Sequence, residues 1–537
     1  MEFFEPDPTH WQSEYSEFLN SFDKNRNNLN ELGLEHWNSE GERGAKDDWE
    51  DNRWDDDRDS WLKSRDTYFS MLLWRKTRKG GLHVSGLLFE ILRQWLRDCD
   101  RHHQECKSEM QFWPTRVIDV GNTDGSELKL VDESLSQHHR DTYVALSHCW
   151  GGPRDEEKKK FCTTRDNLEN RLKGFGMSDL PKTFQDAVQV TRAIGKRYLW
   201  IDAVCIIQCG DPDWDIESKR MEEVFSSAYC TIAANSATDW TQGFLRQSSS
   251  HFPVKGKFGR KMYACTTKHD FERDVNQSNL NKRAWVLQER TLSCRTLHFT
   301  ENHAYFACGR NIRCEDFTTL DSPNRKEYFL LDPVFPKHLT RAGYYRIVEF
   351  IQTLFSQYAS AGLTNESDRQ IAILGLLERI KKVLSSDYEY GTFTIFLARL
   401  LLWRVTEKHD ATTDQFPSWS WLTHNHIKFF PDGSIEVPTT DILRFGVERQ
   451  LHAHIRELDL AEDGGSDGRE HGELWLDSWT DTPPQYCAVV GRLRDEPWKY
   501  CCILLSYDAS NDRYRRVGAC LVQSRYLSRV YQEGIIV

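Results

Sequence analysis

The sequence predicts an α/β protein: a parallel sheet flanked by helices, followed by a helical region and a mostly β C-terminal module. Short apolar runs of about four to six residues, typical of strands buried on both faces, alternate with amphipathic helical patterns between residues 141 and 300. That succession implies parallel strands joined by right-handed crossover helices. A chain of 537 residues also exceeds one ordinary hydrophobic core, which indicates two or three domains.

Composition restricts the function classes. The net charge is −12 and no basic stripe stands out, so nucleic-acid binding is not expected as the main role. No run reaches the roughly 18 apolar residues of a membrane span, and the first residues lack the cationic and apolar regions of a signal peptide. The 15 cysteines lie mostly in apolar segments, as reduced core thiols do. We therefore expect a cytoplasmic protein without a membrane span.

The N-terminal part divides into a polar tail and a helix. Residues 1–65 combine Trp, Asp and Arg with few aliphatic side chains, so we predict an acidic, Trp-rich disordered tail. Residues 82–110 are predicted as a helical N-terminal extension. Its apolar face repeats at helical spacing through Leu87, Leu88, Ile91, Leu92, Trp95 and Leu96.

Three potential metal ligands follow on the same helix. Cys99, His103 and Cys106 are spaced i, i+4 and i+7, so they share one helix face. This geometry suits zinc if a fourth ligand comes from elsewhere. The other interpretation is structural packing, which is favoured because no second motif such as CxxC completes the set. No metal site is therefore assigned.

The α/β domain is predicted at residues 141–300. Its elements are expected in the order strand 143–147, helix 167–173, helix 182–194, strand 198–206, helix 214–228 and strand 230–234. Pro181 at the start and Gly195 just past the end delimit the second helix. Three strands separated by helices predict a parallel sheet.

Two further regions complete the chain. Residues 301–410 are predicted as a helical region with a hairpin, whose strands RTLHF and AYFAC flank the turn TENH. Residues 411–537 are predicted as mostly β, because WKYCCILLSYD and YRRVGACLV read as two strands joined by a DASND turn. The stretch at 461–471 is expected to be a flexible surface loop, since it is rich in Gly and charged residues.

Polar side chains follow the first two strands at the points where they end. Ser147, His148, Trp150 and Gly151 come at the end of one apolar run, and Asp202 follows the next. Ligands of parallel sheets collect beyond the carboxyl ends of the strands, so these residues indicate a binding site. Two roles remain open for Asp202: it binds a ribose hydroxyl or a cationic group, or it caps a loop by accepting backbone N–H groups.

Thiols near the same strand ends raise the question of a Cys/His nucleophile. Adjacent residues of an extended chain point to opposite sides, so His148 is poorly placed to activate Cys149. The sequence also lacks a nucleophile elbow. We therefore expect Cys149 and Cys205 to be packed thiols and disfavour a thiol hydrolase.

Two more segments carry charged candidates. Glu217 lies one helical turn before Met221, so it falls on the inward apolar face of its predicted helix. It either acts as a catalytic carboxylate or complements the helix dipole in the first turn. Further on, Arg283, Trp285, Gln288 and Glu289 place a cation, a carboxamide and a carboxylate within seven residues. Such a set suits phosphate or ribose binding, or simply structural ion pairs.

Taken together, these segments resemble a known family. YVALSHCWGG, LPKTFQDAVQVTRAIGKRYLWIDAVCIIQ, DWDIESKRMEEVFSSAYCTIAA and RAWVLQERTLSCRTLHF occur in the order found in the fungal heterokaryon incompatibility (HET) domain. The upstream WLRDCDRHHQEC and the downstream PSWSW and YRRVGACLV resemble the extensions of large fungal HET proteins. The resemblance runs from about residue 82 to the C-terminus.

The resemblance implies a role in self/non-self recognition, in which the domain triggers the death of incompatible fused cells. HET domains are similar to TIR domains, which implies a flavodoxin-like sheet. Some TIR domains hydrolyse NAD with a glutamate that follows a tryptophan on a helix. Glu217 corresponds to that glutamate, at three residues from Trp214 against four in the usual TIR motif.

The same resemblance implies roles for the other candidates. Cleavage of nicotinamide from ribose passes through an oxocarbenium-like state, which a carboxylate stabilises. We therefore predict Glu217 as the catalytic residue, with NAD as the substrate and no cofactor. Substrate binding is assigned to Ser147, His148, Trp150, Gly151, Asp202, Arg283 and Trp285. In this scheme Trp150 stacks on a ring and Arg283 meets phosphate.

Two functions remain open. The first is an NAD-hydrolysing effector of programmed cell death. The inward Glu217 favours it, and the lack of a glycine-rich phosphate loop after YVALS weakens it. The second is a non-catalytic death-signalling module that acts by assembly. Both imply control by other chains, so we expect self-association or binding to other incompatibility proteins.

Overall fold

The computed structural model describes residues 84–537, with gaps at 107–111, 122–124, 126, 134–140, 209, 211, 246–250, 256–260, 266–268, 316–317, 321–331, 333–334, 407–414, 431–434, 437–442, 447, 460–471 and 479–483. The predicted tail and the loop predicted at 461–471 lie outside the described residues. Residues 91–246 and 269–537 form one compact unit. The hairpin of β7 (His251–Lys255) and β8 (Lys261–Cys265) belongs to a second unit.

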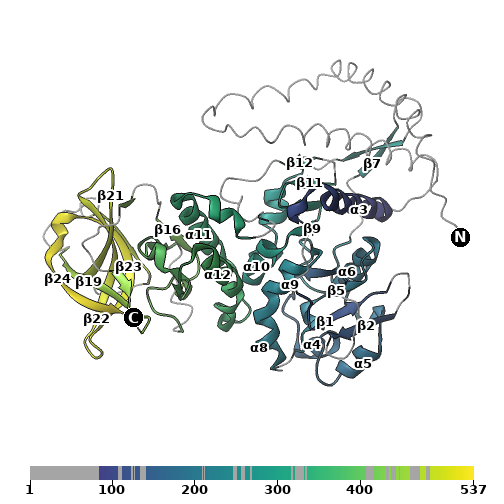
Figure 1. Cartoon of the computed structure of the whole chain (residues 1–537), viewed down its shortest axis with the longest axis horizontal. Helices are drawn as coiled ribbons and strands as arrows, with labels where there is room; N and C mark the ends of the chain where they lie inside the picture. The colour runs from purple at the N-terminus through teal and green to yellow at the C-terminus, as the bar shows by residue number, and fades with distance from the viewer. Residues whose placement is uncertain are drawn as a thin grey trace, which may run out of the picture. The chain divides into compact units, whose positions relative to one another are not determined.

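A ten-stranded sheet organises the first part of the larger unit (Figure 1). Its four central strands run parallel in the order β5 (Tyr198–Trp200), β3 (Tyr143–Ser147), β6 (Cys230–Ala233) and β9 (Arg295–Phe299). Numbered along the chain, this order is 2-1-3-4, as in flavodoxin-like sheets. The predicted α/β fold class is therefore confirmed.

Antiparallel strands extend the sheet on both sides, which makes it a mixed sheet. Beyond β5 lie β1 (Arg116–Asp119), β2 (Glu127–Asp132) and β4 (Phe175–Gly176), and beyond β9 lie β10 (Ala304–Cys308), β11 (Ile312–Cys314) and β12 (Thr319–Leu320). The predicted hairpin is the β9–β10 pair, in which Phe299 lies opposite Ala304. Its first strand is also the fourth parallel strand, which the sequence prediction did not include.

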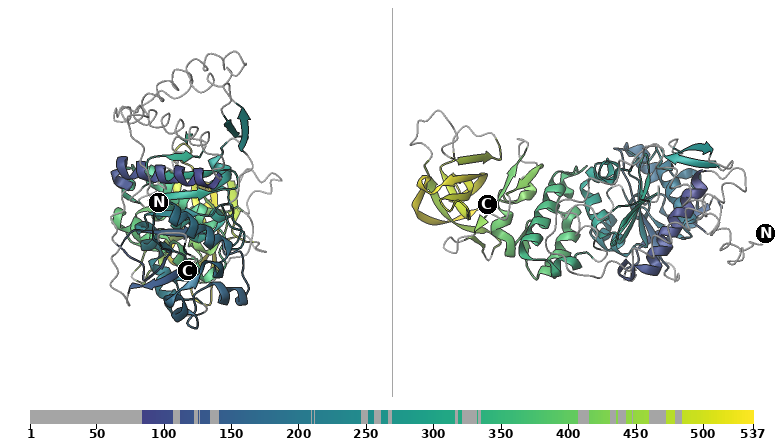
Figure 2. Two further views of the ribbon diagram at one scale, coloured as in Figure 1. Left: turned by 90° about the vertical axis from the view of Figure 1, so that its right-hand side faces the viewer. Right: turned by 90° about the horizontal axis from the view of Figure 1, so that it is seen from above.

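Helices lie on both faces of the sheet (Figure 2). On one face α9 (Met221–Ser227) and α10 (Ala284–Leu292) lie near each other, and Tyr143 of β3 bonds the carbonyl of Val224 in α9. On the other, α6 (Lys182–Ala193) buries Phe184, Ala187, Val188 and Thr191, the apolar face expected from its spacing. The helix α3 (Val84–His102) stacks Trp95 on Phe306 of β10.

Two predicted elements end earlier than expected. The strand predicted at 198–206 stops at Trp200, and a helical turn, α7 (Asp202–Cys205), follows. The turn begins because the Asp202 carboxylate accepts the N–H of Ala203. The helix predicted at 214–228 is split into α8 (Asp213–Glu217), a 3₁₀ turn (Ser218–Arg220) and α9. Between β3 and α6 the short helices α4 (Asp155–Phe161) and α5 (Leu168–Lys173) complete the domain.

A helical region follows the sheet in the chain. Its helices are α11 (Tyr344–Ala359), α12 (Ile371–Leu384) and α13 (Leu397–Leu400), accompanied by the short strand pairs β13 (Tyr388–Glu389) with β14 (Thr392–Phe393), and β15 (Trp403–Val405) with β16 (Ile427–Phe429). The helix α12 packs against α9 and α10 of the α/β domain. The Gly375 N–H in α12 donates to Gln288 Oε1 in α10 at 3.1 Å.

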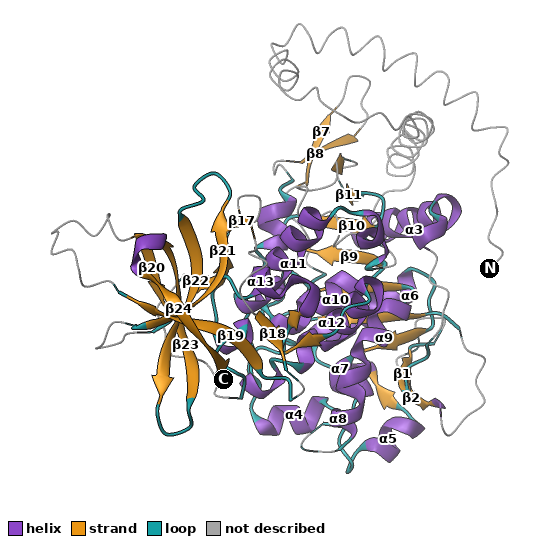
Figure 3. Ribbon diagram, turned by 60° about the vertical axis from the view of Figure 1, so that its left-hand side comes forward, coloured by secondary structure: helices purple, strands orange, loops and turns teal. Residues whose placement is uncertain are grey.

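The C-terminal module is β-rich, as predicted, and five of its strands close into a ring (Figure 3). They are β19 (Leu451–Leu458), β21 (Tyr486–Leu493), β22 (Lys499–Asp508), β23 (Arg513–Gln523) and β24 (Leu527–Ile536), with β17 (Ile435–Glu436), β18 (Leu443–Phe445) and β20 (Gly472–Leu476) at its margins. The ring closes because β19 pairs with both β21 and β24. The predicted hairpin around DASND is β22 with β23.

The cysteines whose burial the structure describes are buried and lie outside any disulfide, as expected for packed thiols. Among the described helices, none has both the length and the apolar character needed to cross a membrane.

Candidate functional site

The carboxyl ends of β3, β5 and β6 meet at one edge of the sheet, where the candidate site lies. β5 and β6 pair with opposite sides of β3, so the chain passes from β3 to β5 on one side and then crosses back to β6 on the other side. This is the topological switch point at which open α/β sheets bind ligands. Ser147 ends β3, while Asp202 and Asn235 follow β5 and β6. The structure thus brings the polar ends of the predicted strands together.

His148 is buried on the α6 side of the sheet. Its ring packs edge-on against Phe184 at 4.9 Å between ring centroids, and its Nδ1 lies 3.7 Å from Asp202 Oδ1. Burial lowers the pKa of His148 to about 4, although the Asp202 carboxylate opposes the shift. The imidazole is therefore neutral at neutral pH, and its buried Nε2 has no hydrogen-bond partner.

Asp202 and Trp150 connect the ends of β3 and β5. Asp202 Oδ2 accepts a hydrogen bond from Trp150 Nε1 at 2.8 Å, and its Oδ1 accepts from the Ala203 N–H at 2.7 Å. The second bond is the capping role considered from the sequence. The Trp150 ring stacks on His148 and on Trp240 at centroid distances of 6.3 and 6.0 Å. Trp150 is half-buried, so these contacts hold an aromatic ring beside the strand ends.

Arg283 reaches the end of β3 from the residue that precedes α10. Its guanidinium donates a hydrogen bond to the His148 carbonyl. Gly151 has a φ of 74°, and a Cβ there would lie 2.2 Å from Asp239 Cβ. The chain therefore turns tightly against Asp239 just after β3, while Arg283 fixes the peptide before the turn.

Glu289 in α10 lies beside Ser147, on the face of the sheet opposite to His148. Its side chain is buried, and burial raises the pKa of Glu289 to about 7, against the opposing effects of the Ser147 hydroxyl and Arg283. The Ser147 hydroxyl is the hydrogen-bonding neighbour of this carboxyl. Sequence reasoning placed Glu289 in a segment suited to phosphate or ribose binding or to structural ion pairs, but did not include it among the assigned site residues.

Asn235 is a further polar residue at this edge. Its Oδ1 pairs with Nδ1 of the buried His298 at 3.1 Å, and its Nδ2 donates to Ser278 Oγ at 2.9 Å. The sequence analysis did not name it. The sequence pattern could have indicated Asn235, because it is a polar residue at the end of an apolar run, as Ser147 and Asp202 are.

Glu217 and Trp285 lie apart from this group. Glu217 is buried, as its inward position predicted, and its Oε1 accepts from Thr115 Oγ1 at 2.7 Å and from Arg220 at 3.3 Å. Trp285 packs edge-on against Trp214 and interacts with the Asp368 carboxyl. In the part of the chain that the structure describes, neither residue makes a hydrogen bond or ion pair to Ser147, His148 or Glu289.

The thiols near the site are packed, as the sequence analysis expected. Cys149 belongs to an apolar cluster with Ala233, Leu280 and Val286, and burial raises its pKa. Burial also raises the pKa of Cys205 to about 12. Neither thiol is activated as a nucleophile would be, so a thiol hydrolase finds no support in this geometry.

The Cys99, His103 and Cys106 set is completed by a residue that the sequence analysis missed. Cys308, at the end of β10, brings its thiol within 4.8 Å of the three other ligand atoms. Nothing in the sequence near Cys308 signals this, because the contact depends on how α3 docks on the sheet.

Comparison with known proteins identifies the family of the α/β domain. Residues 143–289 match the family model described as Heterokaryon incompatibility protein (HET). The matched segment starts at β3 and ends at Glu289, so it contains the residues gathered around the end of β3. Neither the curated proteins nor the solved structures contain a match. The chain therefore contains a heterokaryon incompatibility (HET) domain, at residues 143–289.

Proposed function

We propose that this protein acts in self/non-self recognition as an effector of programmed cell death, and that its HET domain binds and hydrolyses NAD at the end of β3. The family match supports the first part of the proposal. The second part is supported by the position of the site at the switch point of a flavodoxin-like sheet, where nucleotides bind in many α/β proteins.

One observation carries the ligand-binding proposal. His148 Nε2 is a buried polar atom without a hydrogen-bond partner, and it lies at the end of the strand whose last residue, Ser147, interacts with the buried carboxyl of Glu289. Buried polar atoms in native proteins are nearly always paired, because each unpaired one costs about 1–3 kcal/mol. A ligand with several hydroxyl groups, such as a nucleotide ribose, satisfies such atoms on binding.

Two carboxyl groups compete for the catalytic role in breaking the nicotinamide–ribose bond. An ionised carboxylate stabilises the oxocarbenium-like charge that develops on the ribose. Glu289 is buried beside Ser147 and Arg283 at the end of β3, whereas Glu217 lies apart from this group with its Oε1 engaged by Thr115 and Arg220. The geometry therefore favours Glu289 over Glu217, which the family resemblance suggests.

The other residues then have defined roles. Arg283, which is half-buried, meets a phosphate group, and the Trp150 ring stacks on one of the bases. The neutral His148 offers Nε2 to a ribose hydroxyl. Because a constitutive NAD hydrolase would be lethal, activity is switched on by self-association or by other incompatibility proteins.

Nicotinamide release from NAD by the purified full-length chain tests this proposal, at high protein concentration with a crowding agent. We expect turnover by the wild type and a loss of about 100-fold or more in Glu289→Gln, since a group that acts in the transition state typically contributes that much. The activity of the wild type should rise as the pH passes through about 7, where Glu289 ionises. Glu223→Gln, on the half-exposed face of α9, serves as the control.

The outcomes separate the alternatives. Loss of activity in Glu217→Gln, with full activity in Glu289→Gln, would return the catalytic role to Glu217. The absence of turnover under conditions that demonstrably assemble the protein would favour the non-catalytic assembly module instead.

A further inference from the structure

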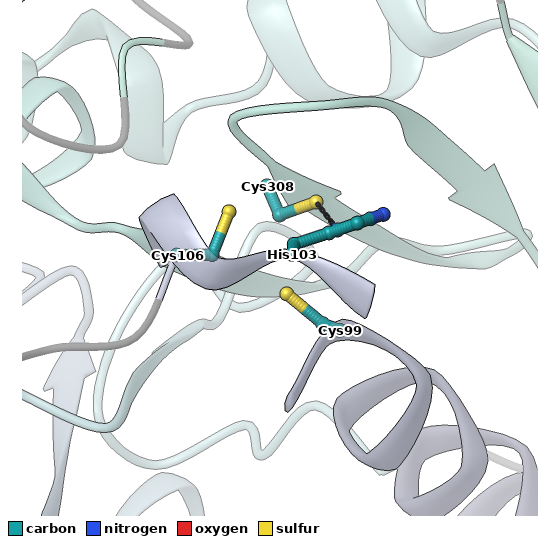
Figure 4. A group of neighbouring side chains, drawn as sticks. All are labelled: Cys99, His103, Cys106 and Cys308. Carbon is teal, nitrogen blue, oxygen red and sulfur yellow. Dashed lines mark hydrogen bonds between the residues drawn. The ribbon is translucent and has the colours of Figure 1, made fainter. Parts of the chain in front are cut away.

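Four potential metal ligands from two distant segments converge beside the sheet (Figure 4). Cys99 lies in the last turn of α3, His103 directly follows this helix, and Cys106 ends a 3₁₀ turn (Gln104–Cys106). Cys308 ends β10, at 205 positions in the chain from His103. One ligand atom of each residue lies within 4.8 Å of all the others.

The backbone holds the first three ligands on one side. The His103 N–H donates to the Cys99 carbonyl at 2.9 Å, and the Cys106 N–H donates to the His103 carbonyl at 3.1 Å. These bonds continue the helical path of α3 through the 3₁₀ turn, so the three side chains keep a common face. The fourth ligand comes from the sheet, which explains why the sequence spacing alone left the set incomplete.

The distances suit a tetrahedral zinc ion. His103 Nδ1 lies 3.4 Å from Cys308 Sγ. When zinc binds sulfur at about 2.3 Å and nitrogen at about 2.0 Å, a tetrahedron places the two ligand atoms roughly 3.5 Å apart. The sulfur atoms of Cys99, Cys106 and Cys308 are buried, whereas His103 is half-buried. Three thiols and an imidazole that converge in this way form a Cys₃His set, as in known structural zinc sites.

A buried cation lies beside the site. The guanidinium of Arg295 donates two hydrogen bonds to the Cys106 carbonyl, at 3.1 and 2.8 Å, and also pairs with the Asp100 carboxylate at 2.6 Å. The Cys294 thiol donates to the same carbonyl at 3.1 Å. Such outer contacts orient the ligands of metal sites.

We propose that Cys99, His103, Cys106 and Cys308 bind one Zn²⁺ ion as a structural site. Four protein ligands fill the tetrahedron, which leaves no open position for a substrate or a reactive water. The ion fastens the N-terminal extension to the HET-domain sheet at a place where ion pairs also join them, Asp98 with Arg313 and Glu105 with Arg310. This site is independent of the reaction proposed at the end of β3.

Metal analysis of the full-length protein tests the proposal. After expression with zinc and removal of loosely bound metal, we expect about one zinc per chain in the wild type. Cys99→Ser and Cys308→Ser should lose most of it, because three ligands bind zinc far more weakly than four. Cys314→Ala is the matched control: it removes a buried thiol of the neighbouring strand β11 that lies outside the set, so this variant should keep its zinc.

A second measurement covers the case in which the ligand variants fail to fold. Cobalt(II) exchanged into the wild-type protein should give the intense absorption of tetrahedral cobalt with thiolate ligands. Cys308→His, which keeps four ligands, should retain the metal with a weakened thiolate-to-cobalt band. A wild-type protein that contains no zinc and takes up no cobalt would overturn the proposal. So would a Cys314→Ala variant that loses zinc as completely as Cys99→Ser does.

Discussion

Glu289 combines burial in the HET domain with a pKa raised to about 7. Burial is the main cause of the raised pKa, since it disfavours the charged form. A buried carboxyl of this kind lowers the free energy of unfolding of the protein whenever it is ionised in the folded state. Proteins retain such groups chiefly at functional sites.

Glu289→Gln is therefore expected to stabilise the protein at high pH. The ordinary pKa of the group is 4.5 and the folded value is about 7, so between these pH values the folded state holds a proton that the unfolded state has lost. The wild type consequently loses stability as the pH rises through this window, by up to about 3 kcal/mol. Glutamine resembles the protonated carboxyl and does not titrate. We expect it to gain about 3 kcal/mol relative to the wild type between pH 4.5 and pH 8.

Urea unfolding of both proteins at the two pH values measures this difference. Glu223→Gln, with a half-exposed side chain, is the control and should show no pH-dependent difference. An equal offset of Glu289→Gln from the wild type at both pH values would show that Glu289 titrates near its ordinary pKa.

The placement of single residues could be predicted from the sequence where one local rule sufficed. The rule that polar residues at strand ends meet at one edge of the sheet located Ser147, His148 and Asp202, whose roles in binding stay predictions, and alternation along the extended chain separated His148 from Cys149. Glu289 and Cys308 were not assigned to a site from the sequence because their neighbours come from other elements. No local pattern carries that information.

At the scale of elements, the approach of α12 to the HET domain depends on one glycine. A Cβ on Gly375 would lie 2.5 Å from Glu222 Cβ in α9 and 2.9 Å from Gln288 Oε1 in α10. The same contact includes the ion pair of Arg379 with Glu222 at 2.9 Å. Glycine is unfavourable inside a helix by roughly 0.5–1 kcal/mol relative to alanine, so its presence here is explained by the close packing.

Gly375→Ala is expected to destabilise the protein by about 1–3 kcal/mol, although alanine favours helices, because the backbones of α12 and α9 must separate. Thermal unfolding measures the loss. Gly343→Ala is the control, since a Cβ at Gly343 meets no atom within 4 Å. Equal melting temperatures for Gly375→Ala and the wild type would show that the helices separate without cost.

The sequence predicted elements well where periodicity and end signals agreed. The helix α6 has both, with Pro181 before it and a regular buried face, and it was found almost to the residue. The strand predicted at 198–206 was too long because its apolar run continues into the buried turn α7. Burial on all sides makes a short strand and a short helix look alike in sequence.

At the scale of the whole chain, the central parallel strands followed from the alternation of elements, but the outer strands did not. β1, β2 and β4 precede or interrupt that alternation, and they join the sheet only through tertiary pairing. The position of the site at the edge of the sheet was predictable for the same reason as the central strands. The positions of the residues that α10 brings to that edge could not be predicted, because they depend on how this helix packs against the sheet.

A buried cation of the C-terminal module, Arg516, contacts the end of the helical region. Arg516 in β23 donates to Asp477 at 2.9 Å and to the carbonyls of Leu401 and Trp403 at 2.8 and 2.6 Å. Its guanidinium also lies over the Trp403 ring, 3.5 Å from the centroid. One side chain thus satisfies polar groups from two separate segments in a buried environment.

Arg516→Met is expected to destabilise the protein by about 3–5 kcal/mol, because it leaves the Asp477 carboxylate and two carbonyls buried without a partner. Tryptophan fluorescence during urea unfolding is the suitable measurement, since Trp403 lies directly under the guanidinium. The exposed neighbour Arg515→Met should change stability by less than about 0.5 kcal/mol. Adding Asp477→Leu to Arg516→Met should recover part of the loss, because no buried charge then remains unpaired. If the two single arginine variants were equally stable, the contact between the two segments would rest on apolar packing instead.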